Sequence, residues 1–387
     1  MRIVHLITRL IIGGAQENTV LSCEGLAAVG HEVILMTGPT IGPEGSLVDR
    51  ANRGHYAFEE LPELVRQISP MSDARALRAL KRRFCELKPD VVHTHSSKAG
   101  VLGRVAARLA DVPLIVHTIH GMSFNRTQPP IVQTAYRMAE RYCADMSHAI
   151  VCVADAMIEQ SLEAGVGRRE QYHTVRSGME VEQFDPARYN EQAVRASWGI
   201  GPEEIVVGTI ARLFENKGYE QLIDVVDFAA RRDRRLRFVW VGDGADRFRY
   251  EGELKRRGLR ERVVFTGLLP PTEMPRVLSG FDMLAHASQW EGLPRAVVQA
   301  LLMEKPAVSF AIDGAPEVVI PGQTGELAAL GDTKGFAEAI LKLAADGDSR
   351  ARFGANGRSR CLIPVDHRTM VAQLDSLYST LLTGRAF

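Results

Sequence analysis

The sequence predicts an α/β protein with two doubly wound parallel-sheet domains that face a central cleft. Short runs rich in Val and Ile alternate with segments of helical period along most of the chain, which is the pattern of βαβ units. The polar segment 179–203 interrupts this alternation once. With 387 residues the chain also exceeds the size at which one hydrophobic core usually stops growing, so two domains are expected.

The strands of the first domain are short apolar runs, expected at residues 2–7, 32–37, 90–95, 113–119, 149–154 and 172–178. Unbroken apolar runs of this length are typical of parallel strands that helices cover on both faces. Helical segments separate them; in segment 98–110, for example, Val101, Val105 and Leu109 fall on one face. Segment 39–75 is the longest connection without such a pattern, and we expect it to be mobile.

The same pattern returns in the second half. Strands are expected at residues 204–211, 236–242, 262–267, 282–288 and 306–311, and helices at 218–231, 246–257, 272–280, 294–304 and 333–345. The domains are therefore expected at 1–180 and 204–365, joined by a linker at 181–203. The amphipathic tail, 366–387, is expected to return as a helix to the first domain.

The charge and cysteine content exclude several classes of protein. Lys plus Arg and Asp plus Glu each number 47, so the net charge is zero and a nucleic-acid-binding surface is not expected. The five cysteines show no C-x-x-C spacing, which disfavours a disulfide framework or zinc knuckle and favours a reducing compartment. The N-terminal apolar run is too short for a signal peptide or a membrane span, so we expect a cytoplasmic protein.

Two glycines, Gly13 and Gly14, follow the first strand and open a helix. Glycine lets a backbone approach an anionic group closely, and a helix N-terminus offers unpaired N–H donors. A plain strand-to-helix turn would use the same residues, and the sequence lacks the G-x-G-x-x-G dinucleotide fingerprint.

Four histidines lie near the ends of two successive strands: His93, His95, His117 and His120. Two histidines at i and i+2 share a strand face and could ligate zinc, but no carboxylate or thiolate at ligand spacing completes a site, so no metal is expected. His120, where the chain leaves its strand, is the better candidate for contact with a ligand. A purely structural role for this histidine stays open.

Two cations, Arg212 and Lys217, lie in the loop between a strand and a helix of the second half. Arg can bond two phosphate oxygens at once while Lys acts as a point charge, and this pair suits a diphosphate. Cations in surface loops are common, so residue type alone leaves both interpretations open.

A second strand-end group follows residues 282–288. It consists of Glu291, Gly292 and Leu293, before a helix expected from about Pro294. Because ligands of open α/β sheets bind beyond the carboxyl ends of the strands, these residues are expected at the cleft. Alternatively, Glu291 only stabilises the helix start through the helix dipole.

The motifs described above, in this order and spacing, resemble family 4 of the retaining glycosyltransferases, which has the GT-B fold. The resemblance is carried by VVHTHSSKAGVLGR, HTIHGMSF, VRSGMEVEQF, GTIARLFENKG, VGDG, EGLPRAVVQALL and GAPEVVIPGQTG, and it extends from Gly13 to about Gly325. It implies an enzyme that transfers a sugar from a UDP or GDP sugar to an acceptor hydroxyl with retention, in glycan, polysaccharide or glycolipid biosynthesis.

The resemblance also implies roles for the strand-end residues. Arg212 and Lys217 would bind the donor diphosphate and offset the negative charge that grows on it. Glu291, with the amides of Gly292 and Leu293, would bind sugar hydroxyls. The second domain would therefore bind the donor, and the first would bind the acceptor.

Further donor contacts are implied in both domains. Gly13 and Gly14 would let the first domain approach the phosphate, and His120 would contact the sugar or the leaving group. Residues around Phe265 to Gly267 would lie near the nucleobase.

No cofactor and no metal are implied, because Arg and Lys replace the divalent cation in this fold. The D-x-D string at Asp346 and Asp348 follows a helix rather than a strand and is interpreted as a loop. Where the family has a second glutamate, eight residues after Glu291, this chain has Gln299. A neutral amide loses charge-assisted bonds to the ribose hydroxyls, so weaker nucleotide binding is expected.

Gln299 also leaves open a non-catalytic nucleotide-sugar binding or scaffold protein of the same fold. A sugar epimerase or a glycogen-type phosphorylase is a third alternative. The acceptor, lipid-linked or a glycan, is expected on the first domain. Beside segment 39–75, a helix carries five cations that could contact anionic lipid at the inner face of a membrane, although such a face is more often simply solvated. These cations are Arg75, Arg78, Lys81, Arg82 and Arg83.

Overall fold

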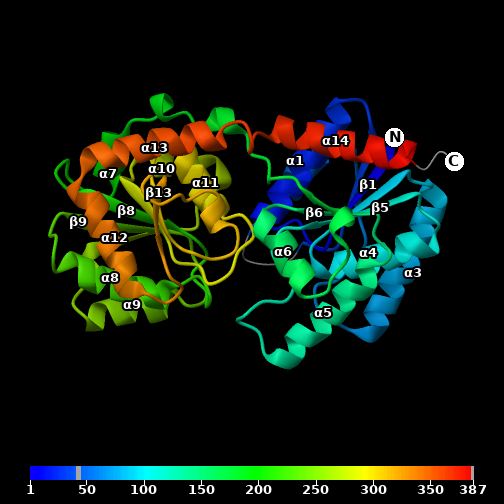
Figure 1. The fold of residues 1–387 in the computed structure, drawn as a ribbon, viewed down its shortest axis with the longest axis horizontal. Coiled ribbons are helices and arrows are strands. Elements are labelled where there is room, and N and C mark those ends of the chain that lie inside the picture. Colours follow the sequence, from blue (N-terminus) through cyan, green and yellow to red (C-terminus); the bar gives the residue numbers. More distant parts are fainter. Residues whose placement is uncertain (41–44, 385–387) are drawn as a thin grey trace. The chain divides into compact units, whose positions relative to one another are not determined.

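The computed structural model describes residues 1–40 and 45–384. The chain folds into two compact units, Met1–Met179 with Val365–Phe387, and Glu180–Pro364. Each unit is built on a parallel sheet with helices packed against it (Figure 1). This confirms the predicted fold class of two doubly wound α/β sheets.

In the described part of the first unit the sheet has seven strands, in the order β3-β2-β1-β4-β5-β6-β7. They are β1 (Arg2–Ile7), β2 (Glu32–Thr37), β3 (Ala57–Glu60), β4 (Val91–His95), β5 (Leu114–Ile119), β6 (Ala149–Cys152) and β7 (Tyr172–Thr174). The helices are α1 (Gly14–Ala28), α2 (Val48–Asn52), α3 (Pro70–Leu87), α4 (Ser97–Leu109), α5 (Pro130–Ala144), α6 (Asp155–Glu163) and α14 (His367–Thr383). All neighbouring strands are parallel, so their carboxyl ends lie at one edge.

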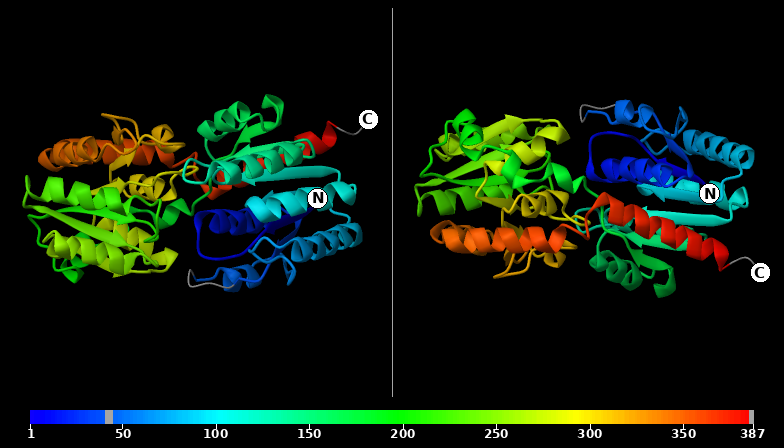
Figure 2. Two further views of the ribbon diagram at one scale, coloured as in Figure 1. Left: turned by 90° about the horizontal axis from the view of Figure 1, so that it is seen from below. Right: turned by 90° about the horizontal axis from the view of Figure 1, so that it is seen from above.

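Alternate residues of these strands supply two cores, one on each face of the sheet. In β1, Ile3 and Ile7 pack with residues of α1 and α14, while Leu6 packs with residues of α3 and α4. Figure 2 shows α14 alongside α1, although the two helices come from opposite ends of the chain. Burying a side chain such as Leu374 of α14 contributes roughly 1.5–3 kcal/mol, so apolar burial holds this last helix on the first unit.

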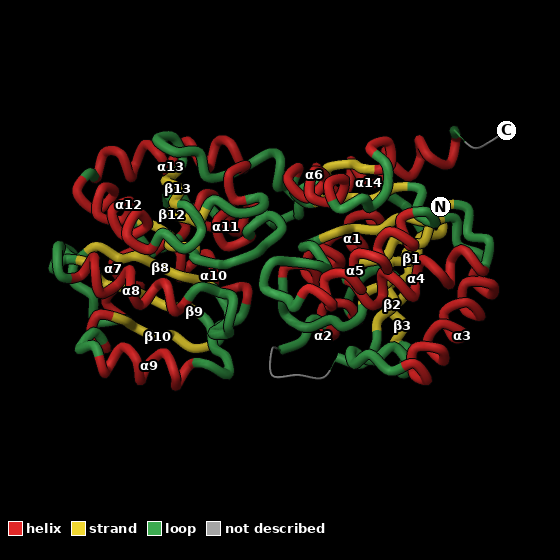
Figure 3. Tube along the Cα trace, turned by 60° about the horizontal axis from the view of Figure 1, so that its bottom comes forward, coloured by secondary structure: helices red, strands yellow, loops and turns green. Residues whose placement is uncertain are grey.

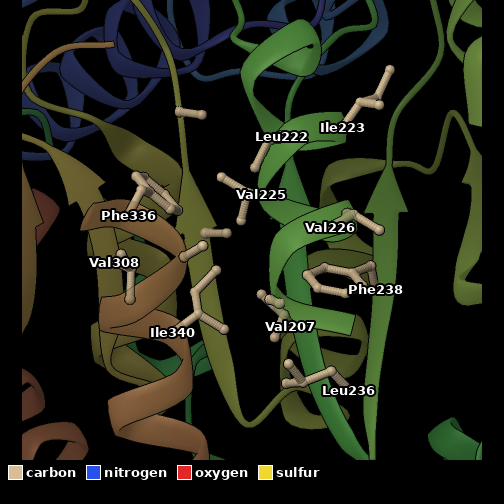
Figure 4. Close-up of a cluster of buried hydrophobic side chains, with 14 of the residues drawn as sticks. Val207, Leu222, Ile223, Val225, Val226, Leu236, Phe238, Val308, Phe336 and Ile340 are labelled. Carbon is tan, nitrogen blue, oxygen red and sulfur yellow. The ribbon is translucent and has the colours of Figure 1, made fainter. Parts of the chain in front are cut away.

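The second unit, all of which is described, has a six-stranded parallel sheet in the order β10-β9-β8-β11-β12-β13 (Figure 3). Its strands are β8 (Ile205–Ile210), β9 (Leu236–Val241), β10 (Val263–Gly267), β11 (Met283–His286), β12 (Ala307–Phe310) and β13 (Gly325–Ala328). Its helices are α7 (Glu191–Ser197), α8 (Tyr219–Ala230), α9 (Arg247–Arg256), α10 (Met274–Ser279), α11 (Arg295–Leu302), α12 (Thr333–Ala345) and α13 (Gly347–Cys361). Figure 4 shows α8 and α12 packed on the strands through side chains such as Val226 and Phe336.

Two strands, β3 and β13, were not predicted. Both are four residues long, lie at an edge of their sheet and contain half-exposed residues, so neither shows an apolar run. Segment 39–75, predicted to lack a pattern, contains both α2 and β3, and its residues 41–44 lie outside the described residues.

The linker predicted at residues 181–203 folds instead as part of the second unit. It contains α7, in which Arg195 donates to the Gly280 carbonyl oxygen at 3.1 Å and to the Asp282 carboxylate at 2.7 Å. Trp198, which follows α7, packs against Phe281 with ring centroids 5.9 Å apart. The polar sequence of this segment predicted a linker. The contacts that stabilise the segment are made with residues distant in the sequence, so the local pattern could not reveal them.

The D-x-D string is the start of a helix and not the predicted loop. The Asp346 side chain accepts a hydrogen bond from the Ser349 amide at 2.9 Å and caps α13, and Asp348 lies in the first turn. Both carboxylates thus stabilise a helix N-terminus. None of the helices in the described part of the chain combines the length and the apolar character needed to cross a bilayer.

Candidate active site

The strand order of the second sheet reverses between β8 and β11. The strands β9 and β10 lie on one side of β8, whereas β11, β12 and β13 lie on the other. The loops that follow β8 and β11, residues 211–218 and 287–294, therefore leave the carboxyl edge together, where doubly wound sheets bind ligands. The two loops are joined directly, because the Gln289 amide donates to the Asn216 carbonyl oxygen at 3.0 Å.

Two glycines allow neighbouring loops to approach the 211–218 loop. Gly218 has a φ of 78°, and a Cβ at this residue would lie 1.9 Å from the Ala287 carbonyl oxygen. Gly242, in the loop after β9, has a φ of 135°, and its Cβ would lie 2.2 Å from the Ala211 carbonyl oxygen. A side chain at either position would be strained and would push the loops apart.

The centre of this edge is an ion pair between Lys217 and Glu291, whose Nζ and Oε1 atoms are 2.6 Å apart. Lys217 also donates to the Ser288 hydroxyl at 3.3 Å. The two side chains are 26% and 21% exposed, so both are accessible to a ligand. Burial alone would raise the pKa of Glu291, but the charge and hydrogen bond of Lys217, together with His286 and Ser288, lower that pKa by more, so the carboxylate is ionised at neutral pH.

A neutral histidine, the last residue of β11, lies next to this pair. The Nε2 atom of the buried His286 is 3.8 Å from Glu291 Oε1 and has no hydrogen-bond partner among the described residues. Burial lowers the pKa of His286 to about 4, although the Glu291 charge opposes this shift. His286 was not predicted as a site residue, because a single histidine in an apolar strand gives no signal by itself.

The backbone after Glu291 is held by the loop that follows β12. The Glu291 amide donates to the Asp313 carboxylate at 2.7 Å, and the Gly314 amide donates to the Gly292 carbonyl oxygen at 3.0 Å. The buried amides of Gly292 and Leu293 donate to no group within this fully described unit. These two N–H groups are therefore available to a ligand beside the carboxylate.

The other predicted residues of this unit follow β8, lie in α11 or belong to β10. Arg212 follows β8 almost directly, and its guanidinium lies 5.2 Å from the centroid of the Phe214 ring. Gln299 lies in the middle of α11, half-buried, and its side chain makes no hydrogen bond within this unit. Gly267 ends β10, two strands away from β8, and the Phe265 ring packs against Trp240 with ring centroids 5.2 Å apart.

The remaining predicted residues belong to the first unit. Gly13 caps α1 and Gly14 is its first residue, so this turn does open a helix, as the sequence predicted. The strand order of this sheet reverses between β1 and β4, whose ends are linked by a 2.8 Å hydrogen bond between the hydroxyls of Thr8 and Ser96. His120 follows β5, the next strand.

Histidines form a buried network behind this edge. His5, His93 and His95 have ring nitrogens within 4.8 Å of one another, a spacing that could suit a metal ion. However, His93 bonds the Tyr378 hydroxyl at 2.5 Å and the Thr118 hydroxyl at 2.6 Å, so both of its nitrogens are engaged. The nitrogens of His95 bond those of His5 and His120 at 2.9 and 3.0 Å.

His117 lies apart from this network and bonds the Thr94 hydroxyl at 2.9 Å on the other face of the sheet. His5 was missed by sequence reasoning, because it joins the network only through the pairing of β1 with β4, which places it opposite His93.

In a comparison with known proteins, each half of the chain matches a family model. Residues 13–178 match the model of the glycosyl transferase 4-like domain, and residues 190–360 match that of the glycosyl transferases group 1. The chain belongs to the group 1 glycosyltransferases. This confirms the resemblance stated from the sequence motifs.

Individual relatives agree with the family. The chain is 26% identical over 352 residues to the UDP-Gal:alpha-D-GlcNAc-diphosphoundecaprenol alpha-1,3-galactosyltransferase of Escherichia coli, covering 89% of this chain and 88% of the relative. It is 26% identical to the putative glycosyltransferase EpsD of Bacillus subtilis over 79% of this chain and 80% of that protein.

Solved structures show the same fold. The crystal structure of Anabaena HepE in complex with UDP and glucose matches with a TM-score of 0.81 at 20% identity, over 98% of this chain and 100% of HepE. Sucrose-phosphate synthase from Thermosynechococcus elongatus matches with a TM-score of 0.83 at 20% identity, over 99% and 100%. The group 1 glycosyltransferase described here therefore has the GT-B fold.

Proposed function

We propose that this glycosyltransferase moves a sugar from a nucleoside-diphosphate donor to an acceptor hydroxyl, with retention and without a metal ion. The Lys217–Glu291 pair carries the proposal, because it places a cation suited to a diphosphate beside a carboxylate suited to sugar hydroxyls. The name of the E. coli relative and the ligands of HepE, a UDP sugar in one case and UDP with glucose in the other, support such a donor.

In this mechanism Arg212 and Lys217 offset the charge that develops on the departing diphosphate, which is the work of a divalent cation in many other transferases. The departing phosphate takes the proton of the acceptor hydroxyl, so the protein supplies no separate general base. Glu291 with the amides of Gly292 and Leu293 binds the sugar hydroxyls.

We assign further donor contacts from the resemblance to this family. His120 contacts the sugar or leaving group, and the turn at Gly13 and Gly14 contacts the phosphate. Residues near Phe265 and Gly267 bind the nucleobase, and Gln299 binds the ribose.

A thermal-shift screen of UDP and GDP sugars tests donor binding, because a bound ligand stabilises the native state by mass action. The stabilising sugar is then incubated with candidate acceptors, and the anomeric proton of the product is examined by NMR. We expect retention and an unchanged rate in the presence of EDTA. An inverted product, or activity that requires an added divalent ion, would overturn the corresponding part of the proposal.

Turnover separates this function from its alternatives. A non-catalytic nucleotide-sugar binding protein, which Gln299 would suit, shows donor stabilisation but no transfer or donor hydrolysis across a broad acceptor screen. A phosphorylase requires inorganic phosphate, and an epimerase releases an isomerised sugar without an acceptor.

The acceptor is proposed to be lipid-linked or a glycan, bound by the first unit at the cytoplasmic face of a membrane. The name of the E. coli relative contains such a lipid, diphosphoundecaprenol, and none of the five cysteines, all of them described, forms a disulfide, as in a reducing compartment. The α3 helix supports membrane contact through exposed cations, together with Ile68 and Met71, which are 76% and 72% exposed near its start. The exposed cations are Arg75, Arg78, Lys81 and Arg82.

The fifth predicted cation, Arg83, is not counted in this exposed group, because it pairs with Glu59 at 2.6 Å and with Glu86 at 3.0 Å.

Co-sedimentation with anionic vesicles tests membrane contact through α3. Changing the four exposed cations to Ser should abolish sedimentation. As a control, the same change at the exposed arginines of the second unit should leave it intact; these are Arg231, Arg232, Arg234 and Arg235. Sedimentation that is unaffected by the α3 changes would dismiss membrane contact through α3.

A further inference from the structure

His286 reaches the carboxyl edge of the second sheet from inside the sheet, as the last residue of β11. Met283 and Ala285 belong to the core beneath α8 and α12, and because side chains alternate along a strand, His286 lies on the opposite face. His286 is only 6% exposed, so a ligand has little access to it. Any effect of this histidine on a bound sugar must therefore act through a neighbouring side chain.

The Nε2 atom of His286 is the unusual feature. It is buried, has no hydrogen-bond partner among the described residues and lies 3.8 Å from Glu291 Oε1. Buried polar atoms without a partner are rare in folded proteins, so this atom requires an explanation. An N–H···O bond spans about 2.9 Å, so the two atoms are about 1 Å too far apart for one while Lys217 holds the carboxylate.

The neighbouring charges favour a proton on this nitrogen. Burial lowers the pKa of His286 to about 4, so the ring is neutral at neutral pH and carries one N–H. Of the two charges that act on the ring, Glu291 has the larger effect and Lys217 the smaller. A carboxylate attracts a proton on Nε2 and repels a lone pair there, with little screening because the atom is buried. The proton is therefore expected on Nε2, where Glu291 can accept it.

The proposed function places two demands on Lys217. Its ammonium group pairs with Glu291 at 2.6 Å, and a diphosphate would compete with the carboxylate for the same three N–H groups. Of the groups that lower the pKa of Glu291, only His286 and Ser288 would then remain. The single hydroxyl hydrogen of Ser288 also has the Trp290 carbonyl oxygen within reach, at 3.3 Å. His286 is thus the donor that has no other acceptor.

We propose that His286 is a positioning residue, which donates from Nε2 to Glu291 when Lys217 turns to the charge that develops on the donor diphosphate. The bond holds the carboxylate in place for the sugar hydroxyls at the moment when its first partner is drawn away. The tasks of Lys217 and Glu291 toward the donor rest on the proposed function, whereas the exchange of partners at Glu291 can be tested without it.

Lys217→Ala imitates the departure of the ammonium group and needs no substrate. In protein labelled with ring-¹⁵N histidine, the His286 signals are assigned by their loss in His286→Gln. Wild-type His286 should carry its proton on Nε2, and in Lys217→Ala the Hε2 signal should move downfield as the bond to Glu291 forms. The shift should disappear in Lys217→Ala/Glu291→Ala. A wild-type proton on Nδ1, or an Hε2 signal that Lys217→Ala leaves in place, would overturn the inference.

The matched control for these spectra is Lys342→Ala, which breaks an ion pair of the same 2.6 Å length with Glu326 in the same unit. It should leave the His286 signals unchanged. A shift of the same size in Lys342→Ala would show that the signal does not report on Glu291, and would also overturn the inference.

Transfer kinetics test the inference during turnover. His286→Phe keeps a ring but removes the donor, and kcat should fall about tenfold, the factor that one hydrogen bond to a charged group is worth. The donor KM should change less, because the bond forms only as the diphosphate charge develops. His286→Gln, whose amide nitrogen can replace Nε2, should restore most of kcat. Equal losses in both variants, or none in either, would contradict a positioning role. A wild type without transfer would refute the proposed function, while the Lys217→Ala spectra would still decide the role of His286.

Discussion

The two units have sheets of the same winding but place different chemistry at their carboxyl edges. In the second unit, the partly exposed charges of Lys217 and Glu291 meet at the loops that follow β8 and β11. In the first unit, His5 and His95 are buried in the sheet, and their bonds reach the loops only through His120. An exposed charged pair can bind and stabilise charge, whereas a buried neutral network can only orient the group at its end.

The largest expected difference between the two units is in how far acidification lowers their unfolding free energy. Burial lowers the pKa values of five histidines in the first unit, but in the second unit it lowers only that of His286; the five are the fully buried His5, His93, His95 and His117 and the half-buried His173. Below about pH 6.5 the unfolded chain binds protons that the folded chain does not, so the unfolding free energy is steady above that pH and falls below it. Each fully buried histidine lowers the unfolding free energy by about 1.4 kcal/mol per pH unit, so the first unit should lose at least about four times as much as the second.

Optical probes can separate the units in this titration. All three tryptophans, Trp198, Trp240 and Trp290, belong to the second unit, so their fluorescence reports on that unit, while far-ultraviolet circular dichroism reports on both. The dichroism should change at a higher pH than the fluorescence. The exposed His55→Gln variant should leave both midpoints unchanged, and coincident midpoints in the wild type would contradict the comparison.

Removing the charge at the second edge is expected to give the next largest effect. Lys217→Ala should lower kcat/KM by about 10²–10³-fold, as does the loss of one group that stabilises transition-state charge in other enzymes. Lys342→Ala is a matched control, because Lys342 forms an ion pair of the same 2.6 Å length with Glu326 at the surface of the same unit. Initial rates for the two variants test this, and equal rates would show that Lys217 does not act on the donor.

The smallest expected effect concerns the departure from the family pattern. Gln299→Glu should tighten donor binding by about fivefold, because a charge-assisted bond to a ribose hydroxyl adds about 1 kcal/mol over a neutral one. Calorimetry with the donor nucleotide measures the change, and Gln323→Glu, at an exposed position of the same unit, is the control. Unchanged or weaker binding by Gln299→Glu would mean that this side chain does not contact the ribose.

Strong local patterns allowed most of the fold to be predicted. The buried strands β1 and β2 lie at the residues expected for them, because a fully covered strand needs an uninterrupted apolar run. The edge strands β3 and β13 escaped prediction because one side of an edge strand is unpaired, and their half-exposed residues need not be apolar. The α13 helix was missed for a similar reason, since it contains many polar residues and begins at an Asp-capped turn.

Sequence alone located the buried strands β8 and β11 and the loops that follow them, and thereby identified Lys217 and Glu291 as candidates for one ligand. Only the tertiary structure showed that these residues, 74 positions apart, are 2.6 Å from one another, and that His5 lies against His95. The physical reason is that apolar periodicity is local and defines each strand, whereas the order of strands in a sheet depends on how helices pack across both of its faces. Contacts between elements that are distant in the sequence, including those of α7 with the loop before β11, are therefore decided by packing.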